Sequence, residues 1–285
     1  MITFAPARVD REMLHRYQAL FRACFPPSEK FTPNALEWLY ADNPDGLVVG
    51  YDAIEGERLA AHYVCIPTTI RIDGDHAKAL LSLNTATHPD YRGKGLFTRL
   101  AERTYEAAAE RGFHSVYGVA NANSTPGFVR KLGFQLVEPL QARIGIGSLG
   151  IHLASAARDA QFQRVWTQDS LGWRCANPAN AVRYTQMSDG LGLFAAAYGR
   201  ILSAYAELPL NAPVPTHAVA NRAPSQFRLY LGLAPSSACR PSAYVPIPDR
   251  LRPSPLNLIF RPLTQRGSRL EAGHVNFSFL DFDAY

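Results

Sequence analysis

The chain has 285 residues, of which 47% are hydrophobic and 19% charged, so it is too apolar for a disordered protein and long enough to bury a sizeable core. Its formal net charge of +5 is well below what a dedicated nucleic-acid-binding protein of this length carries. Residues 151–285 hold the whole positive excess, with 13 arginines, no lysine and 8 acidic residues. These arginines either form a solvated surface or help to hold an anionic ligand.

The first half of the chain predicts a sheet covered by a few helices. Asp10 is a typical helix N-cap, and Pro33 favours the first turn of a second helix. We expect helices at Arg11–Cys24, Pro33–Tyr40, Leu96–Arg111 and Thr125–Lys131. We expect strands at Ile2–Val9, Leu47–Ile54, Arg58–Ile72, Lys78–Thr87, His114–Ala120 and Gln135–Gly147. This order of elements predicts an α+β fold with mixed α/β layers.

The second half gives weaker signals. We expect a helix at Ile151–Arg164 and strands at Leu191–Tyr198, Ile201–Ala206, Phe227–Leu233, Leu256–Pro262 and Val275–Phe282. The proline-rich stretches Pro209–Pro224 and Pro235–Pro255 predict long loops. The segment Trp38–Pro44 resembles Trp173–Pro178, which is one residue shorter, and either chance or an internal duplication explains the similarity.

Several classes of protein are excluded by what the sequence lacks. No secretory or membrane segment is predicted, since Arg8 and Asp10 interrupt the N-terminus before an apolar run forms. Cysteines occur singly, at Cys24, Cys65, Cys175 and Cys239, so we expect reduced thiols, no bound metal and a cytoplasmic location. The signatures of P-loop NTPases, α/β-hydrolases, zinc proteases and dinucleotide-binding enzymes are absent.

The most informative segment is the one where a strand ends and a helix begins, Thr87–Leu100. The backbone N–H groups at a helix N-terminus are unpaired and, together with the helix dipole, attract anions. Gly93 and Gly95 allow a phosphate to approach the main chain, and Arg92 and Lys94 add positive charge. The segment is either an ordinary basic turn or a cradle for a diphosphate.

This segment is similar to motif A of the GNAT N-acetyltransferase superfamily, which is a strand, then [RQ]xxGx[GA], then a helix. Arg92 and Gly95 match that motif, and Phe97 departs from its final Gly or Ala. The run Asn121–Phe134 resembles motif B, a short helix that ends in K-x-G-F, through Asn123 and the run Lys131–Phe134. The resemblance covers residues 1–147, and the order of elements fits it as well.

The resemblance implies a GNAT fold whose two central strands splay apart, with the pantetheine arm of acetyl-coenzyme A, or of another acyl-coenzyme A, lying between them. Backbone groups of Thr85–Thr87 would then pair with the pantetheine amides. The residues implied in coenzyme binding are Thr85, Ala86, Thr87, Arg92, Gly93, Lys94, Gly95, Leu96, Phe97, Thr98, Asn123 and Phe128.

The catalytic groups are not determined by the sequence. Val129 stands where many GNAT members carry a Tyr that protonates the leaving thiolate, and Leu81 and Leu83 stand where some carry Glu or His. His62 is a candidate base that faces either the core or the cleft, whereas His88 precedes Pro89 and is typical of a turn. The further candidates are Tyr91, Asn121, Asn123, Asp281, Asp283 and the carboxylate of Tyr285.

The second half resembles the C-terminal part of longer bacterial GNAT proteins. No second [RQ]xxGx[GA] match follows residue 150, so we expect a degenerate GNAT-like domain at 148–285 that shapes the acceptor site beside a GNAT domain at 1–147. Trp173 is expected to anchor a core, and Arg174 either clamps a ligand or forms a structural ion pair.

Taken with the resemblance, these features predict an acyl-coenzyme-A-dependent N-acyltransferase that acts on a small amine, with a nucleotide-linked amino sugar as one candidate because of the arginine excess. The alternatives are an acetyltransferase of an antibiotic or peptide amine, and a non-catalytic acyl-coenzyme A sensor. We expect a small-molecule amine partner and neither nucleic-acid binding nor membrane insertion; the sequence leaves the oligomeric state open.

Overall fold

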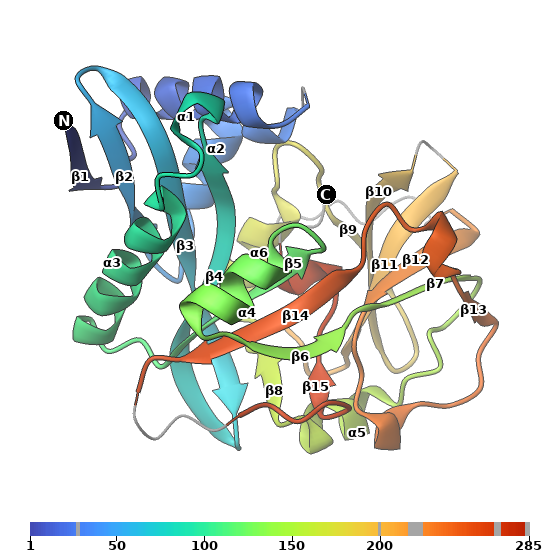
Figure 1. The fold of residues 1–285 in the computed structure, drawn as a ribbon. Coiled ribbons are helices and arrows are strands. Elements are labelled where there is room, and N and C mark those ends of the chain that lie inside the picture. Colours follow the sequence, from blue (N-terminus) through green and yellow to red (C-terminus); the bar gives the residue numbers. More distant parts are fainter. Residues whose placement is uncertain (27–28, 199–200, 216–224, 265–268, 283–285) are drawn as a thin grey trace.

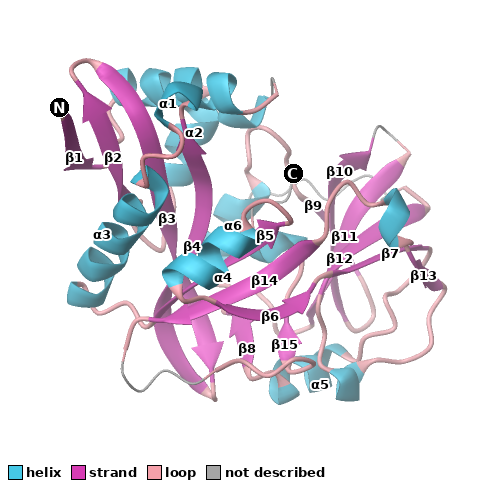
Figure 2. Ribbon diagram, in the orientation of Figure 1, coloured by secondary structure: helices cyan, strands magenta, loops and turns pink. Residues whose placement is uncertain are grey.

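The computed structural model of the chain describes residues 1–26, 29–198, 201–215, 225–264 and 269–282. It consists of two β-sheets that lie side by side, with helices packed around them (Figures 1 and 2). The helices are α1 (Arg11–Cys24), α2 (Pro33–Tyr40), α3 (Leu96–Glu110), α4 (Thr125–Leu132), α5 (Leu153–Asp159) and α6 (Gln168–Cys175). This architecture confirms the predicted α+β class with mixed layers.

In the described part of the chain, the first sheet has nine strands and contains most of the first half of the sequence. Its main path runs β1 (Ile2–Pro6), β2 (Val49–Glu55), β3 (Arg58–Ile72), β4 (Asp75–Thr87), β5 (Ser115–Asn121), β14 (Leu256–Pro262) and β6 (Gln135–Pro139). Two short strands, β8 (Phe162–Arg164) and β15 (Val275–Asn276), extend it beside β3. Buried side chains of α1 and α2 pack on one face, and those of α3 and α4 pack on the other.

Among the residues that the structure describes, the second sheet has six strands, in the order β13 (Tyr244–Pro246), β7 (Gln141–Gly145), β12 (Phe227–Gly232), β11 (Leu202–Pro209), β10 (Gly190–Tyr198) and β9 (Arg183–Gln186). Its topology repeats that of the first sheet. In each, three antiparallel strands follow a short helix, and the third pairs in parallel with a fourth. The second half therefore has a GNAT-like arrangement of strands, as the sequence predicted.

The two sheets exchange one strand each. Strand β14, from the second half, lies between β5 and β6 of the first sheet, and β7, from the first half, lies between β12 and β13 of the second. The expected strand region Gln135–Gly147 thus divides at Leu140, whose N–H donates to the carbonyl of Leu256 at 2.7 Å. The division into 1–147 and 148–285 remains a prediction, because a strand from each range completes the other sheet.

The two related segments noted in the sequence meet in the core between the sheets. The indoles of Trp38 in α2 and Trp173 in α6 stack with their centroids 4.7 Å apart. Each Nε1–H donates to the other residue's carbonyl, at 3.1 Å and 3.0 Å. This reciprocal pairing places α2 and α6 as equivalent elements of the two halves, and Trp173 anchors the core, as expected.

Local signals set the helix boundaries in the first half. The Asp10 carboxylate accepts from the N–H of Met13, so the expected N-cap is confirmed. Pro33 begins α2 as expected, and the Thr32 hydroxyl caps that helix by accepting from the N–H of Ala35. Two expectations in the second half are wrong. The helix expected at Ile151–Arg164 covers only α5, because the residues after it pair with β3 as β8. The strand expected at Val275–Phe282 covers only β15, because a capping box between Ser278 and Asp281 starts a 3-10 turn.

Candidate functional site

The first sheet opens between its two central parallel strands. Strands β4 and β5 pair only from Ala79–Ser82 to Ser115–Gly118, and beyond Ser82 they diverge. A bulge in β4 adds to the opening, with Asn84 in the left-handed region at φ +49°. The facing edges of the two strands therefore leave backbone groups without a partner strand, which is the splayed geometry that the sequence predicted.

A cavity of about 330 Å³ lies at this opening. Four segments contribute to its wall: the end of α1, the end of β4, the turn before α3, and the start of α4. The lining residues are Cys24, Phe25, Thr85, Ala86, Thr87, Arg92, Phe97, Asn123, Ser124, Gly127 and Phe128. The cavity thus gathers seven of the residues that the sequence assigned to coenzyme binding, which lie far apart along the chain.

The turn before α3 carries the unpaired amides that an anion site requires. Gly93 and Gly95 have φ of +78° and +68°, a region that favours glycine. The first amide of the helix that reaches a carbonyl is that of Arg99, which donates to Gly95 at 3.2 Å. Within the described ranges, the three preceding amides of the helix have no such acceptor. These N–H groups and the helix dipole create a positive potential at the mouth of the cavity.

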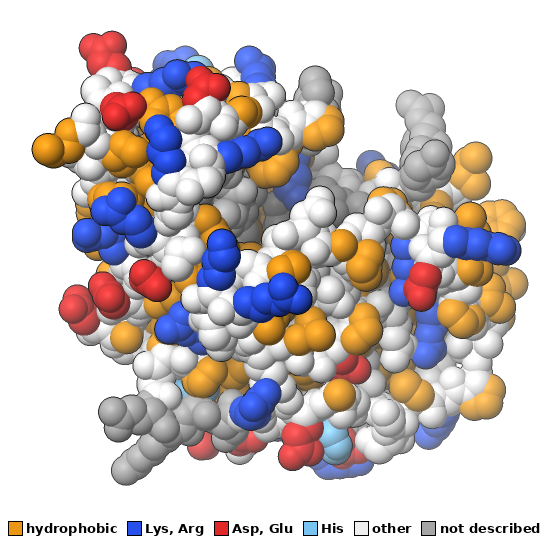
Figure 3. All heavy atoms as spheres, in the orientation of Figure 1, with side chains coloured by type: hydrophobic (Ala, Val, Ile, Leu, Met, Phe, Trp, Pro, Cys, Tyr) orange, Lys and Arg blue, Asp and Glu red, His pale blue; other side chains and the backbone are white. Residues whose placement is uncertain are grey.

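The two basic residues of the turn differ in their surroundings. The Lys94 ammonium lies 4.6 Å from the centroid of the Tyr91 ring, and the Tyr91 hydroxyl donates to Glu55 at 2.9 Å. Arg92 lines the cavity, is exposed and forms no ion pair with the part of the chain that the structure describes. The guanidinium of Arg92 is therefore free to bind an anion at the cavity. Figure 3 shows further basic side chains on the face that carries α3 and α4.

The five other residues of the predicted coenzyme set do not line the cavity. Gly93, Lys94, Gly95 and Thr98 belong to the turn and the first helical residues beside it, and they are available through their backbone. The Leu96 side chain is 2% exposed and packs in the core under α3, so only its amide faces the turn.

Two residues from the end of α1 also line the cavity, and no signal in the sequence indicated them. The Cys24 thiol donates to the carbonyl of Thr87 at 3.3 Å, which joins α1 to the end of β4. Burial raises the pKa of the Cys24 thiol, while the nearby Arg92 charge partly opposes that shift. Phe25 is beside it in the wall. Their place depends on how α1 packs across the sheet, which no local motif encodes.

The catalytic candidates fall into different environments. His62 is fully buried, so it faces the core, and its ring bonds to Asp52 and Tyr40. The Asn121 carboxamide oxygen accepts from the N–H groups of Asn123 and Ser124, both at 3.0 Å, and so holds the turn before α4. Asn123 lines the cavity and is exposed. Of these three, only Asn123 is placed to contact a ligand directly.

Neither His88 nor Tyr91 lines the cavity. His88 sits in the turn before α3, where its Nδ1 accepts from the N–H of Asp90, as the sequence indicated. Tyr91 is held by Glu55. Asp283 and Tyr285 lie outside the described residues. Leu81 is buried in the core and Leu83 packs against it.

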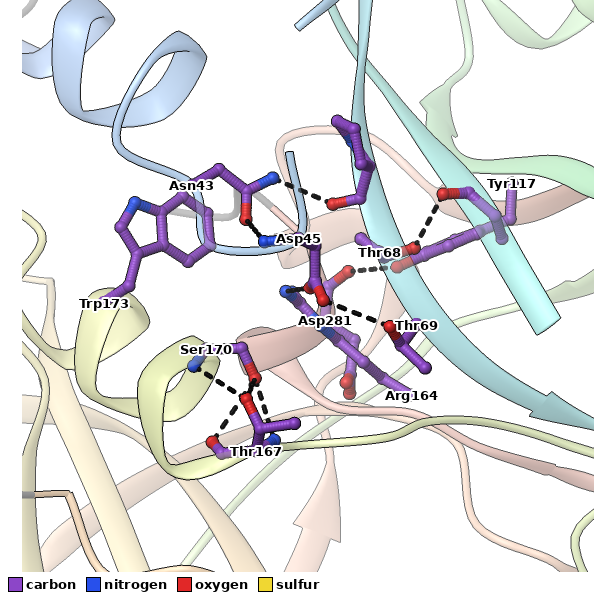
Figure 4. A network of polar contacts seen from close by, with 12 residues as sticks. Asn43, Asp45, Thr68, Thr69, Tyr117, Arg164, Thr167, Ser170, Trp173 and Asp281 are labelled. Carbon is purple, nitrogen blue, oxygen red and sulfur yellow. Dashed lines mark hydrogen bonds and ion pairs between the residues drawn. The ribbon is translucent and has the colours of Figure 1, made fainter. Parts of the chain in front are cut away.

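Asp281 lines a different cavity, of about 230 Å³, between the two sheets. Its carboxylate accepts from the N–H and hydroxyl of Ser278, at 2.6 Å and 3.0 Å. Burial raises the pKa of Asp281 to about 6. Figure 4 shows it beside Arg164, which pairs with Asp45 at 3.3 Å. This network joins the two halves of the chain and does not reach the opening between β4 and β5.

The side chain of Arg174 has a structural role. Its Nη2 donates to the carbonyls of Phe279 and Phe282, which ties α6 to the C-terminal turn.

None of the helices in the described ranges is long and apolar enough to cross a lipid bilayer. In the same ranges, no cluster of His, Cys, Asp and Glu has the geometry of a metal site.

Comparison with solved structures agrees with the fold. The chain superposes on a probable N-acyltransferase from Enterococcus faecalis V583, with a TM-score of 0.61 and 12% identity, over 92% of this chain and 73% of the other. A GCN5-related N-acetyltransferase from Anabaena variabilis ATCC 29413 gives 0.61 and 11% over 92% and 73%. Eis1 from Mycobacterium abscessus gives 0.57 and 12% over 92% and 74%. At these identities, the likeness shows a shared fold.

The sequence comparisons match a smaller part of the chain than the structural comparisons do. No curated protein sequence matches this chain significantly. The family model of the acetyltransferase (GNAT) domain matches residues 6–137, which include α1 to α4 and the turn with its unpaired amides. Residues 6–137 of this chain, a little under half of it, therefore match the acetyltransferase (GNAT) domain family.

Proposed function

We propose that the protein is an N-acyltransferase that transfers an acetyl or short acyl group from acyl-coenzyme A to a primary amine of a small molecule. The observation that carries the proposal is the cavity at the splayed strands, which combines unpaired strand edges with unpaired helix amides. The family of residues 6–137 supports it independently. A cytoplasmic location is part of the proposal, and the four cysteines are free thiols.

The residues of the cavity fit the two chemically different parts of coenzyme A. The backbone groups of Thr85–Thr87 that face the gap have no partner strand there and suit the amides of a pantetheine arm, because a strand edge needs hydrogen-bond partners. The amides before Arg99, with the Arg92 guanidinium, suit a diphosphate. Bound acyl-coenzyme A supplies an acyl group that is activated as a thioester.

The apolar floor of the cavity suits the acyl end. The rings of Phe97 and Phe128 meet edge to face with centroids 5.2 Å apart, and both line the cavity. They exclude water from the inner end of the gap, which strengthens polar interactions made there. Positioning the amine against the acyl carbonyl accounts for much of the rate enhancement in this proposal. A weakly basic residue or water then takes the amine proton.

The acceptor is proposed only as a primary amine on a small molecule. A nucleotide-linked amino sugar requires cationic groups for its diphosphate, but several arginines of the second half already bind the protein itself. Arg174, Arg228 and Arg261 each donate to backbone carbonyls, and Arg164 pairs with Asp45. The amino sugar therefore stays one candidate beside antibiotic and peptide amines.

Calorimetric titration with acetyl-coenzyme A, followed by thiol release with a panel of amines, tests the proposal. The panel contains nucleotide-linked amino sugars, aminoglycosides and short peptides. We expect binding with one molecule per chain, and turnover with one class of amine. Binding without turnover on any amine would favour the acyl-coenzyme A sensor instead. Absence of binding would overturn the whole assignment of the cavity.

A further inference from the structure

A chain of hydrogen bonds runs from a buried carboxylate to the bulge in β4. The Asp52 carboxylate is 2.6 Å from Nδ1 of His62, and Nε2 of His62 is 3.1 Å from the hydroxyl of Tyr40. The Tyr40 hydroxyl in turn accepts from the side-chain Nδ2 of Asn84 at 3.0 Å. The first three residues are at most 1% exposed, whereas Asn84 is half-buried. The chain therefore connects a buried charge with a partly accessible amide.

The order of donors along this chain follows from the carboxylate at its end. A carboxylate accepts, and Nδ1 of His62 is the ring atom placed to donate to Asp52. With the ring proton on Nδ1, Nε2 is an acceptor, and the Tyr40 hydroxyl donates to it. The Tyr40 oxygen accepts an N–H of Asn84. Each bond thus fixes the next, and Asn84 must present its NH₂ group to Tyr40 and keep its Oδ1 free.

Within the described part of the chain, Oδ1 of Asn84 accepts no hydrogen bond. Asn84 lies directly before Thr85, which lines the cavity. Its side chain reaches α2 through Tyr40, so it is on the α1 and α2 side of the sheet, whereas Phe97 and Phe128 pack on the α3 and α4 side. Its neighbours in β4 on the α1 and α2 side, Leu83 and Ala86, are apolar. Among Leu83, Asn84 and Ala86, therefore, Asn84 is the residue that presents a polar side chain on the α1 and α2 side of β4.

We propose that Oδ1 of Asn84 accepts a hydrogen bond from the N–H of the acceptor amine, and that Tyr40, His62 and Asp52 are positioning residues that hold the Asn84 amide in this orientation. The inference rests on the proposed function. The helix amides and the Phe97 and Phe128 rings that suit coenzyme A lie on the α3 and α4 side of the gap, so in this proposal the amine approaches the thioester from the other side, where Asn84 lies. An amide oxygen binds an N–H without taking its proton, and so orients the amine lone pair toward the acyl carbonyl.

Two coenzyme A thioethers test the inference without knowledge of the natural acceptor. In the first, the sulfur carries CH₂–C(O)–NH–CH₃, whose N–H occupies the place of the amine. In the second it carries CH₂–C(O)–O–CH₃, an ester of similar shape that lacks this N–H. The ratio of their dissociation constants, measured by calorimetry on the full chain, reports the single hydrogen bond. We expect the wild-type protein to bind the amide about five- to tenfold more tightly than the ester.

The variants locate the acceptor of that hydrogen bond. Asn84→Gly tolerates the positive φ and removes the carboxamide, so the ratio falls to about one. Tyr40→Phe leaves Asn84 in place but frees its amide to rotate, so the ratio falls to about two. Tyr105→Phe is the matched control, because it removes another buried hydroxyl, bonded to Tyr63 on the other side of the sheet. Its ratio should equal that of the wild-type protein.

The outcomes separate this inference from the proposed function. If neither analogue nor coenzyme A binds the wild-type protein, the proposed function falls, and this inference falls with it. If both analogues bind the wild-type protein equally, or Asn84→Gly keeps the wild-type ratio, the role of Asn84 is overturned while coenzyme binding stands. If Tyr40→Phe keeps the ratio, the positioning role of Tyr40, His62 and Asp52 is overturned. A partial loss of fold would weaken the binding of both analogues by the same factor, so it could not by itself lower the ratio of their dissociation constants.

Discussion

Phe97 and Gly127 fit against each other in the wall of the cavity, since a Cβ atom added at Gly127 would lie 3.2 Å from Cε1 of Phe97. The ring of Phe97 stands where the GNAT motif has a small residue, and the glycine of α4 makes room for it. The first turn of α3 therefore accommodates an aromatic ring because a residue without a side chain faces that ring from α4. This pair sets the width of the cavity at its apolar end.

Gly127→Ala is expected to weaken binding of acetyl-coenzyme A about three- to tenfold, because the new methyl group displaces Phe97 into the cavity. Calorimetry measures the change. Gly172→Ala is the matched control in α6, since a Cβ there meets no atom within 4 Å. It should leave binding unchanged and raise the free energy of unfolding by about 0.5–1 kcal/mol. Equal binding by Gly127→Ala and the wild-type protein would show that Phe97 does not limit the cavity.

Gly95→Val is expected to reduce coenzyme A binding at least a hundredfold, because a β-branched residue does not tolerate φ of +68° and the turn must rearrange its amides. Gly74→Val introduces the same kind of strain at φ +92° in the hairpin turn between β3 and β4, at the opposite end of β4 from the cavity, where a Cβ also meets no atom within 4 Å. Calorimetry and circular dichroism on both variants separate loss of binding from loss of fold. If both variants bind normally, the turn before α3 does not hold the diphosphate.

Cys24 is expected to react slowly with iodoacetamide near neutral pH. Burial raises the pKa of its thiol, so that less of the reactive thiolate is present. Cys239 is exposed and should react first. Mass spectrometry of tryptic peptides gives both rates. Saturating acetyl-coenzyme A should protect Cys24 and not Cys239, because only Cys24 lines the cavity. Equal protection of the two thiols would contradict the location of the coenzyme site.

Asp281 should make the protein less stable as the pH rises through the acid range. Burial raises its folded-state pKa from 3.8 to about 6, so between these values the folded state holds more of the proton than the unfolded state. The stability that this group contributes is therefore fully present below its unfolded pKa and is lost as the pH rises through about 6. The variant Asp281→Asn, whose amide does not titrate, would lack this dependence.

Urea unfolding of the wild-type protein and Asp281→Asn at about pH 4 and about pH 7.5 measures the effect. The free energy of unfolding of Asp281→Asn, relative to that of the wild-type protein, should rise by up to roughly 3 kcal/mol between the lower and the higher pH. This figure follows from the pKa of Asp281, which burial raises by about two units. A difference that does not depend on pH would mean that Asp281 titrates normally. The other carboxyl groups, including Glu207, are common to both proteins and cancel.

The stacked indoles should couple the stability of the two halves. Trp38→Ala and Trp173→Ala are each expected to lower the free energy of unfolding by about 3–5 kcal/mol, through lost burial and a lost hydrogen bond. In the double variant the second substitution should cost at least about 1 kcal/mol less than the first, since the shared contact is already gone. If the losses of unfolding free energy in the two single variants simply add up in the double variant, the contact between the two indoles does not contribute to stability.

The helices of the first half could be predicted because their signals are local. Asp10 and the apolar positions at helical spacing lie within a single segment, and the observed limits of α1 match the prediction. The same holds for α2, with Thr32 and Pro33. The helix expected at Ile151–Arg164 was partly wrong because Phe162–Arg164 are held as a strand by residues of β3 about 90 positions earlier.

Part of the candidate site was predictable for the same reason. The glycines, the arginine and the first helical residues of the turn before α3 are consecutive, so one stretch of sequence contains their chemistry. Cys24 and Phe25 reach the cavity only because α1 packs across the end of β4. His62 was ambiguous because alternation along β3 does not say which face is buried, and the structure places it in the core.

The sequence by itself determined the elements, the GNAT motifs and the basic turn, because these depend on capping, periodicity and backbone freedom over a few residues. Only the tertiary structure decided which segments meet. The exchange of β7 and β14, the stacking of Trp38 on Trp173 and the connection of Asp52 to Asn84 all join residues distant in the chain. Such contacts are selected by the burial of whole faces and the pairing of buried polar groups, which are properties of the assembled core.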